Sequence, residues 1–167
     1  MVTRLVLLGC LLLSACTPPG KSPSVANARL APPVPEFGPQ VGEMTQQRVK
    51  DLIAINHALE IYRSGHDEKY PRSGPAFDSY ASLGERWMPQ IAIRYISPLP
   101  RDPAGGSDPA GPQYLYWSDG QDFKLIAANT GDCSPAVETG GVRIDPKRSD
   151  AGGCKAYGFW SEGAAQH

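Results

Sequence analysis

The chain has 167 residues, enough for one folded domain, and its 16 Lys and Arg nearly balance 17 Asp and Glu to give a net charge of -1. This balance provides no basic surface for nucleic acid, which argues against a nucleic-acid-binding protein. Hydrophobic residues make up 41% of the chain and suffice for a core, whereas 18 Gly and 17 Pro indicate that part of it is unstructured.

Residues 1–15 are predicted to be a lipoprotein signal peptide. Arg4 supplies a positive charge, and the apolar run from Leu5 to Leu13 suits a signal peptide but is too short to span a bilayer. The run ends in Leu13-Ser14-Ala15-Cys16, which resembles the bacterial lipobox. The resemblance implies cleavage before Cys16 and lipidation of its thiol. An ordinary secretory signal with an incidental Cys, or a buried N-terminal helix, is the alternative.

The lipid on Cys16 would make a membrane the first partner of the chain. Thr17 follows Cys16, whereas inner-membrane lipoproteins of Gram-negative cells usually carry Asp at that position. The expected location is therefore the bacterial cell envelope, at the outer membrane and facing the periplasm. Residues 16–43 are rich in Pro and Gly and show no apolar period, which predicts a lipidated Cys followed by a flexible tether.

The folded domain is expected to span residues 44–167 and to open with a helix from about Thr45 to Arg63. Thr45 is the expected N-cap, and Gly65 lies just past the end. Ile55 lies off the main apolar stripe, so a second helix face is expected to be partly covered. The stripe, which has helical spacing, consists of Val49, Leu52, Ile53, Ala58, Leu59 and Tyr62.

After the helix, residues 72–112 are expected to be irregular, apart from a short helix around Ser79 to Ile93 that contains Pro89. Two strands, 113–117 and 123–127, flank an Asp-Gly turn and predict a β-hairpin. Residues 142–145 and 156–160 are candidates for further strands. One long helix followed by a small antiparallel sheet is the pattern of an α+β fold.

Cys133 and Cys154 are the cysteines that remain after processing and lipidation. In an oxidising compartment they are predicted to form a disulfide that closes a C-terminal loop of about 20 residues. A metal site or two free thiols are the alternatives. Neither Cys has a neighbouring Cys or His at zinc-ligand spacing, which disfavours zinc.

The run from Arg48 to Ala127 resembles the globular domain of type IV pilins and of the major pseudopilins of type II secretion. The matching pieces, in order, are Ala58–Tyr62, Tyr70-Pro71, Tyr95–Pro103 and Tyr114–Tyr116 with the hairpin that follows. The resemblance implies a pilin-like domain with a C-terminal disulfide loop, in a structural or accessory component of a secretion or pilus-type system. The chain lacks the prepilin-peptidase site and the long apolar helix of pilins, so ordinary filament assembly is not expected.

Major pseudopilins bind calcium in a C-terminal loop, so the acidic residues of the corresponding region need an interpretation. Asp132, Asp145 and Asp150 are interpreted as solvated loop carboxylates rather than calcium ligands. Asp119 and Asp122 are interpreted as turn formers, because Asp favours such turns without any metal.

No catalytic residue, cofactor site or metal site is predicted, and the chain is not expected to be an enzyme. Its three His, at positions 57, 66 and 167, belong to no local catalytic motif, and the fingerprints of nucleotide, zinc-protease and serine-hydrolase sites are absent. Glu60 with Asp67 or Glu68 is interpreted as solvated surface.

Two alternative functions remain open. The first is a ligand-binding module that holds calcium or a glycan through its acidic loops or its strand aromatics. The second is a periplasmic hydrolase with an unrecognised site. Tyr114 and Tyr116 would share one side of a strand, with Leu115 and Trp117 on the other. We expect the helix and the disulfide loop to cover both sides.

Overall fold

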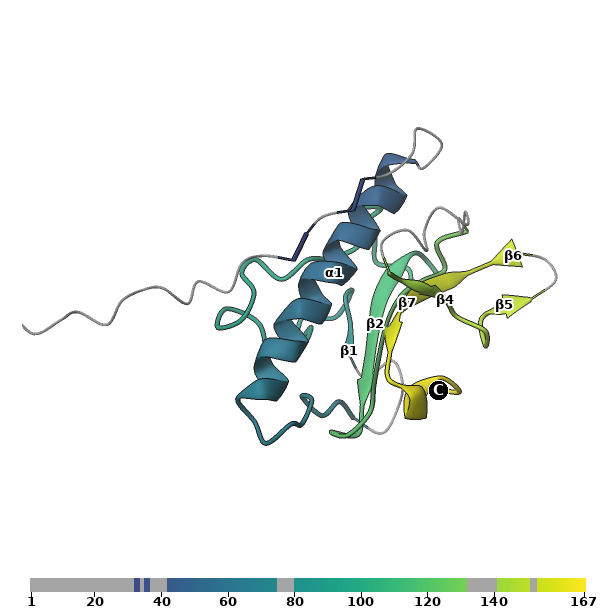
Figure 1. Cartoon of the computed structure of the whole chain (residues 1–167). Coiled ribbons are helices and arrows are strands. Elements are labelled where there is room, and N and C mark those ends of the chain that lie inside the picture. Colours follow the sequence, from purple (N-terminus) through teal and green to yellow (C-terminus); the bar gives the residue numbers. More distant parts are fainter. Residues whose placement is uncertain (1–31, 34, 37–41, 75–79, 132–140, 151–152) are drawn as a thin grey trace, which may run out of the picture. The chain divides into compact units, whose positions relative to one another are not determined.

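Figure 1 shows the structure, a computed structural model that describes residues 32–33, 35–36, 42–74, 80–131, 141–150 and 153–167. The signal peptide, Cys16, most of the tether and Cys133 lie outside the described residues. Within the described part, no helix has the length and apolar character needed to cross a membrane.

Helix α1 (Glu43–Ser64) extends slightly beyond the predicted helix at both ends. The predicted N-cap is wrong, because the cap is Gly42, no side chain caps the helix, and Thr45 is buried inside the first turn. The earlier start places Glu43 in the first turn, where a carboxylate interacts favourably with the helix dipole. Gly65 follows the end as predicted and donates its N–H to the Tyr62 carbonyl.

The buried face of α1 is rotated relative to the predicted stripe. Ile55, expected outside the main stripe, is fully buried, whereas Ile53 and Tyr62 are only half-buried. The sheet and the loop after α1 both pack against the helix. The helix residues that become buried are therefore those that face either of these two elements. The apolar residues of this face are Val49, Leu52, Ile55, Ala58 and Leu59.

Five strands form an antiparallel sheet in the order β1-β2-β3-β7-β4. Its centre is the predicted hairpin, confirmed as β2 (Gln113–Ser118) and β3 (Phe123–Ala128). The other strands are β7 (Ala156–Trp160), β4 (Arg143–Ile144) and β1 (Tyr80–Ala81). A separate pair consists of β5 (Ser149–Asp150) and β6 (Gly153–Cys154). The described chain thus has the expected α+β class.

The helix predicted around Ser79 to Ile93 is wrong. Residues 80–81 form edge strand β1, and turns and bends follow up to Pro98, with an isolated bridge between Ala92 and Ile96. Pro89 disfavours helical backbone at the preceding residue. Met88 is not helical and has a positive φ of 42°. The apolar residues that suggested a helix are buried from a loop instead, with Trp87 and Ile91 in the core and the Trp87 indole donating to the Pro100 carbonyl.

Both faces of the sheet are covered, as expected, but the cover that the structure describes on the second face is the C-terminal segment and not the predicted disulfide loop. Tyr114 and Tyr116 lie in the core beneath α1, while Leu115 and Trp117 belong to a second cluster on the opposite face. The second cover is the C-terminal segment: the short 3-10 helix η3 (Glu162–Ala164) buries Ala164 there, and His167 stacks on Trp117 with ring centroids 3.7 Å apart. Residues 132–140 of the predicted disulfide loop lie outside the described residues.

Gly158 in β7 permits close packing at the centre of the sheet. It pairs with Ile126 on one side and with Arg143 on the other. A Cβ atom at this position would overlap the Leu125 carbonyl oxygen. The sheet therefore requires glycine here for space rather than for a positive φ.

Polar contacts fix the position of α1 on the rest of the domain. Arg48 makes two hydrogen bonds to Asp102, at 2.8 and 3.1 Å, and their side chains are 4% and 1% exposed. The Tyr114 hydroxyl donates to Asp51 at 2.7 Å. Because a buried polar group that loses its partner is costly, these contacts favour one register of the helix on the sheet.

Replacing Asp51 by Asn is expected to flatten the pH dependence of stability. Burial raises the pKa of the Asp51 carboxyl, and repulsion from Asp102 adds to this, although hydrogen bonds from Tyr114 and Gln47 oppose it. In the unfolded chain the carboxyl titrates near its ordinary pKa of about 4, so the folded state holds this proton more tightly. Stability is therefore lost as pH rises through the raised pKa, and Asp51→Asn, which stays neutral, avoids this loss.

The measurement is urea unfolding of both proteins between about pH 4 and pH 7, where the wild type should lose more stability than the variant. Asp51→Ala is the control. It leaves the Tyr114 hydroxyl buried without this acceptor and should lower the free energy of unfolding by about 1–3 kcal/mol. Identical pH profiles for the wild type and Asp51→Asn would contradict the buried-charge assignment.

Candidate functional site

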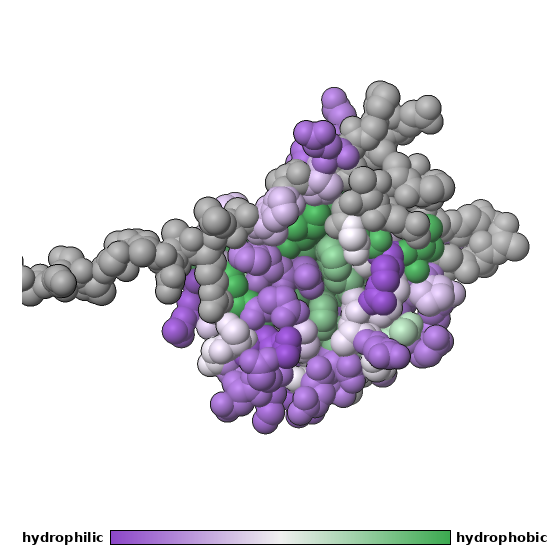
Figure 2. Space-filling view, in the orientation of Figure 1, coloured by the Kyte–Doolittle hydropathy of each residue, from purple (hydrophilic) through white to green (hydrophobic). Residues whose placement is uncertain are grey.

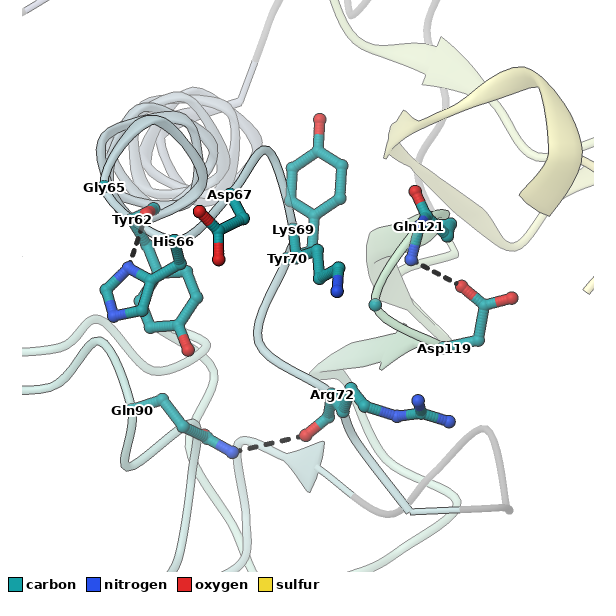
Figure 3. A pocket seen from close by; sticks show the side chains of 11 residues that line it. Tyr62, Gly65, His66, Asp67, Lys69, Tyr70, Arg72, Gln90, Asp119 and Gln121 are labelled. Atoms are coloured by element: carbon teal, nitrogen blue, oxygen red, sulfur yellow. Dashed lines mark hydrogen bonds between the residues drawn. The ribbon is translucent and has the colours of Figure 1, made fainter.

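A cavity of about 610 Å³ opens where α1 ends, with part of its lining from the chain that leaves the helix and part from the β2–β3 turn. Figure 2 shows mainly hydrophilic residues at the end of the domain where α1 finishes. Figure 3 shows the side chains that line the cavity. The lining includes the side chains of Tyr62, His66, Asp67, Lys69, Arg72, Gln90 and Asp119.

Two hydrogen bonds hold the chain that leaves α1 against the hairpin. Tyr70 donates its N–H to the Gly120 carbonyl, and the Tyr116 hydroxyl donates to the Pro71 carbonyl. Gly120 has a φ of 99°, a conformation that favours glycine at this turn. The Tyr70-Pro71 pair and the Asp-Gly turn, far apart in the sequence, therefore form one wall.

Two stacked rings belong to the helix side of the cavity. The Tyr62 and His66 rings are parallel within 1°, with centroids 3.7 Å apart, and Figure 3 shows one ring lying over the other. The His66 Nδ1 lies 2.7 Å from the Tyr62 carbonyl oxygen, so Nδ1 donates and Nε2 is the ring's second polar atom. Tyr95 meets both rings edge-on, which further fixes them.

The residues after α1 adopt unusual backbone angles. Asp67 and Glu68 have φ of 52° and 57°, in the left-handed region that non-glycine residues seldom occupy. Glu68 is held by an ion pair with Arg63, and Lys69 donates its N–H to the His66 carbonyl. Figure 3 shows the Asp67 carboxylate extending from this turn beside the stacked rings.

Asp119 and Arg72 bring opposite charges to the opposite side. Asp119 Oδ1 accepts the N–H groups of Gln121 and Asp122, both at 2.8 Å. These backbone donors hold the pKa of the Asp119 carboxyl below its ordinary value, and Arg72 contributes in the same direction. The cavity thus has two carboxylates, Asp67 and Asp119, and two cations, Lys69 and Arg72.

Gln90 carries a buried acceptor that has no partner in the described part of the chain. Its Nε2 donates to the Arg72 carbonyl at 3.2 Å and to the Tyr80 hydroxyl at 2.8 Å. These bonds fix the amide, yet its Oε1 is buried and has no hydrogen bond to any described residue. A buried carbonyl oxygen normally has a donor, so Oε1 can accept one from a bound molecule.

Tyr70 gives the cavity no acid–base group at neutral pH. Burial and the hydrogen bond from its hydroxyl to Glu60, 2.7 Å long, raise the pKa of Tyr70 to about 12. The phenol therefore stays protonated. Glu60 also accepts from Arg63, and Arg63 pairs with Glu68, so Glu60 and Glu68 are partly exposed surface residues that share a cation.

The predicted disulfide stays a prediction. Cys16 and Cys133 lie outside the described residues, as does Asp132. Cys154 belongs to β6, in register with Ser149 of β5, but its side chain is not among those described. The same holds for the side chain of Asp150. Within the described part, no group of three His, Cys, Asp or Glu could hold a metal ion.

The interpretation of Asp145 as a solvated carboxylate is wrong. Asp145 is fully buried and pairs with Lys124 at 2.9 Å and with Arg148 at 3.0 Å. Lys124 is itself fully buried on β3, so its ammonium needs a counter-charge in the interior. The sequence sets one Lys within an otherwise apolar strand, Phe123-Lys124-Leu125-Ile126, but nothing in it identifies Asp145 as the partner.

The interpretation as a turn former is confirmed for Asp119, whereas the Asp122 side chain bonds to a residue outside the turn. Asp119 caps the turn through the two bonds described above, and Asp122 accepts a hydrogen bond from the Ser161 hydroxyl at 2.6 Å. Asp119 also lines the cavity, which its role in the turn does not preclude.

Most of the cavity residues were not predicted as a site. His66 was noted only as belonging to no local catalytic motif, Arg72 lies in a stretch expected to be irregular, and Gln90 lies within the helix wrongly predicted around Ser79 to Ile93. The spacing of Tyr62 and His66, four residues apart, is the one local signal, since such residues are neighbours on a helix.

Comparison of the chain with protein-family models, with curated proteins and with solved structures finds no match. The function is therefore inferred from the chain's own residues and geometry.

Removing Asp145 is expected to destabilise the fold severely. Asp145→Ala leaves Lys124 buried without its carboxylate, which typically costs about 3–5 kcal/mol of unfolding free energy. Replacing both residues, as Lys124→Met with Asp145→Leu, should restore part of that loss, because an apolar pair needs no counter-charge. Urea unfolding measures both effects.

Asp108→Ala is the matched control, because the Asp108 carboxylate is exposed and accepts a local bond from the Ala110 N–H. It should change stability by about 1 kcal/mol or less. A loss for Asp145→Ala no larger than for Asp108→Ala would refute the buried pair.

Proposed function

We propose that this chain is a lipid-anchored, non-enzymatic protein of the bacterial cell envelope, a structural or accessory component related to a secretion or pilus-type system. Two features of the sequence support the anchor: the lipobox-like Leu13–Cys16 at the end of an apolar run, and the Pro-rich segment after it. An acyl anchor with such a tether would place the domain near the membrane and leave its surface free for partners.

The observation that carries the accessory role is the exposure of Ile93. Its side chain is 87% exposed and its φ is 72°, an unfavourable conformation for a β-branched residue. The backbone conformation costs about 1–3 kcal/mol, and full burial of an Ile would gain about 1.5–3 kcal/mol. A protein partner that covers Ile93 would gain the free energy of burying this side chain.

The loop presents Ile93 in a fixed position. The Ile93 N–H donates to the Ile96 carbonyl at 3.1 Å, and the Tyr95 N–H donates to the carbonyl of fully buried Ile91 at 3.0 Å. The neighbouring Arg94 is exposed. An apolar side chain beside a cation fits a partner surface that has an apolar pocket next to a carboxylate.

A pilin-like domain without an apolar N-terminal helix fits an accessory component better than a filament subunit. The order of one long helix, an irregular loop and an antiparallel sheet supports the pilin-like reading of α1 and β2–β3. In this proposal the lipid takes the place of the missing apolar helix as the membrane attachment.

The ligand-binding alternative receives no support from the residues first considered for it. Tyr114 and Tyr116 are fully buried, and Asp145 is occupied by Lys124 and Arg148. Neither set offers a surface for calcium or a glycan. No specific observation favours the hydrolase alternative.

Cys16→Ser is expected to release the full-length protein from the membrane. A Ser hydroxyl cannot take the thioether-linked lipid, so the anchor is lost while the domain is unchanged. Membrane fractionation and metabolic labelling with an alkyne fatty acid measure the effect, with Cys10→Ser as the control that should stay labelled and membrane-bound. A Cys16→Ser protein that still sediments with membranes would contradict the anchor.

Ile93→Asn is expected to abolish partner capture without lowering stability. Asn tolerates the left-handed backbone, so the change relieves strain while it removes the apolar contact. The measurement is cross-linking in isolated envelopes, followed by mass spectrometry of what the wild type captures. Arg86→Asn, an exposed polar change in the same segment, is the control.

The proposal predicts secretion or pilus components on the wild type and on Arg86→Asn, and at least about tenfold less on Ile93→Asn, equal to about 1.4 kcal/mol. Equal capture by Ile93→Asn, or capture of proteins unrelated to such systems, would refute the role of this loop.

A further inference from the structure

We propose that the cavity at the C-terminal end of α1 binds a carbohydrate. Apart from Asp119, the site lies outside the acidic loops and strand aromatics considered above, and it needs neither the lipid anchor nor the Ile93 contact. Three observations lead to this ligand class: the charge balance of the lining, its mixture of fixed donors and acceptors, and its ring wall.

The charges favour a ligand without net charge. Asp67 and Asp119 are matched by Lys69 and Arg72. Glu68, the other carboxylate of this turn, is already paired with Arg63. A phosphate site needs surplus cations, and a calcium site needs several oxygen ligands with surplus negative charge. The cavity has neither surplus.

The polar atoms match hydroxyl groups, each of which donates and accepts. Gln90 Oε1 is a buried acceptor without a protein donor, and the second oxygen of Asp119 has no hydrogen bond among the described residues. Lys69 and Arg72 supply donors from the side of the turn. A polyhydroxylated ring can satisfy donors and acceptors at once, and a bound hydroxyl would give Gln90 Oε1 its missing donor.

The ring wall supplies the apolar contact that a sugar also needs. One face of a pyranose ring exposes mainly C–H groups, which pack on the electron-rich face of an aromatic ring. Tyr62 and His66 are fixed by their mutual stacking and by the edge of Tyr95. The volume of about 610 Å³ lies within the range of small-molecule sites, and fixed walls limit the entropy lost on binding.

The test is a titration of the full-length protein, solubilised in a polyoxyethylene detergent that contains no sugar. The probes are maltose and N,N′-diacetylchitobiose, and backbone amide NMR shifts provide the readout. We expect saturable shifts at residues 65–72 and 119–121 for at least one probe. The absence of saturable shifts with both sugars would overturn the proposal.

Two variants identify the contacts. Gln90→Ala and Asp119→Asn should each weaken sugar binding about tenfold or more, equal to about 1.4 kcal/mol. Asp119→Asn keeps the oxygen that caps the turn and removes only the charge. Asp108→Asn is its matched control, because Asp108 accepts a backbone N–H in the same way but lies outside the cavity lining, and it should bind as the wild type does.

Titrations with small ligands of other classes test whether the cavity prefers a sugar. Calcium chloride, inorganic phosphate and glycine are titrated under the same conditions, and the proposal requires weaker binding of each than of the better sugar. Tighter binding of any of them at the same amides would reassign the site and overturn the proposal. An equal loss of sugar affinity in Asp119→Asn and Asp108→Asn would also overturn the proposal. Thermal melts of each variant establish that it is folded before its titration is compared.

Discussion

Strands β2 and β3 are buried along their whole length and on both faces, and this constraint organises the described domain. A small antiparallel sheet with two apolar faces needs two covers. Helix α1 covers the face that carries Tyr114 and Tyr116, and η3 with the C-terminal residues covers the face that carries Trp117. The loop before β2 contributes Trp87 and Ile91 to the core beside α1.

Two-sided burial also explains the polar side chains in the interior. Lys124 alternates with core residues along β3 and lies beneath the second cover, so its ammonium finds Asp145 and the carbonyl oxygens of Ala165 and His167 there. On the other face, Tyr114 reaches Asp51 of α1. In both places a buried polar group is satisfied from another element, which ties each cover to the sheet in one register.

The features that carry the proposed functions lie outside this core. Ile93 and the cavity belong to the connections on either side of β1 and to the β2–β3 turn, where backbone strain gathers at Asp67, Glu68 and Ile93. Such strain persists only when firm packing and hydrogen bonds hold the loop. The hairpin supports the turn of Asp67 and Glu68 through the bonds from Tyr70 to Gly120 and from Tyr116 to Pro71, and hydrogen bonds within its own loop hold Ile93.

The sequence by itself determined the elements whose signals are local. The helical period, the Asp-Gly turn between two apolar runs and the chain order of helix and strands predicted α1, the β2–β3 hairpin and the α+β class, since each depends on residues close in the chain. Tertiary structure alone decided that Ile55 faces the core, that Trp87 and Ile91 reach it from a loop, and that Asp145 is buried. It also brought His66, Gln90 and Asp119 to one cavity. These outcomes depend on pairs of residues far apart in sequence, and burial, charge pairing and strain are set only once such pairs meet.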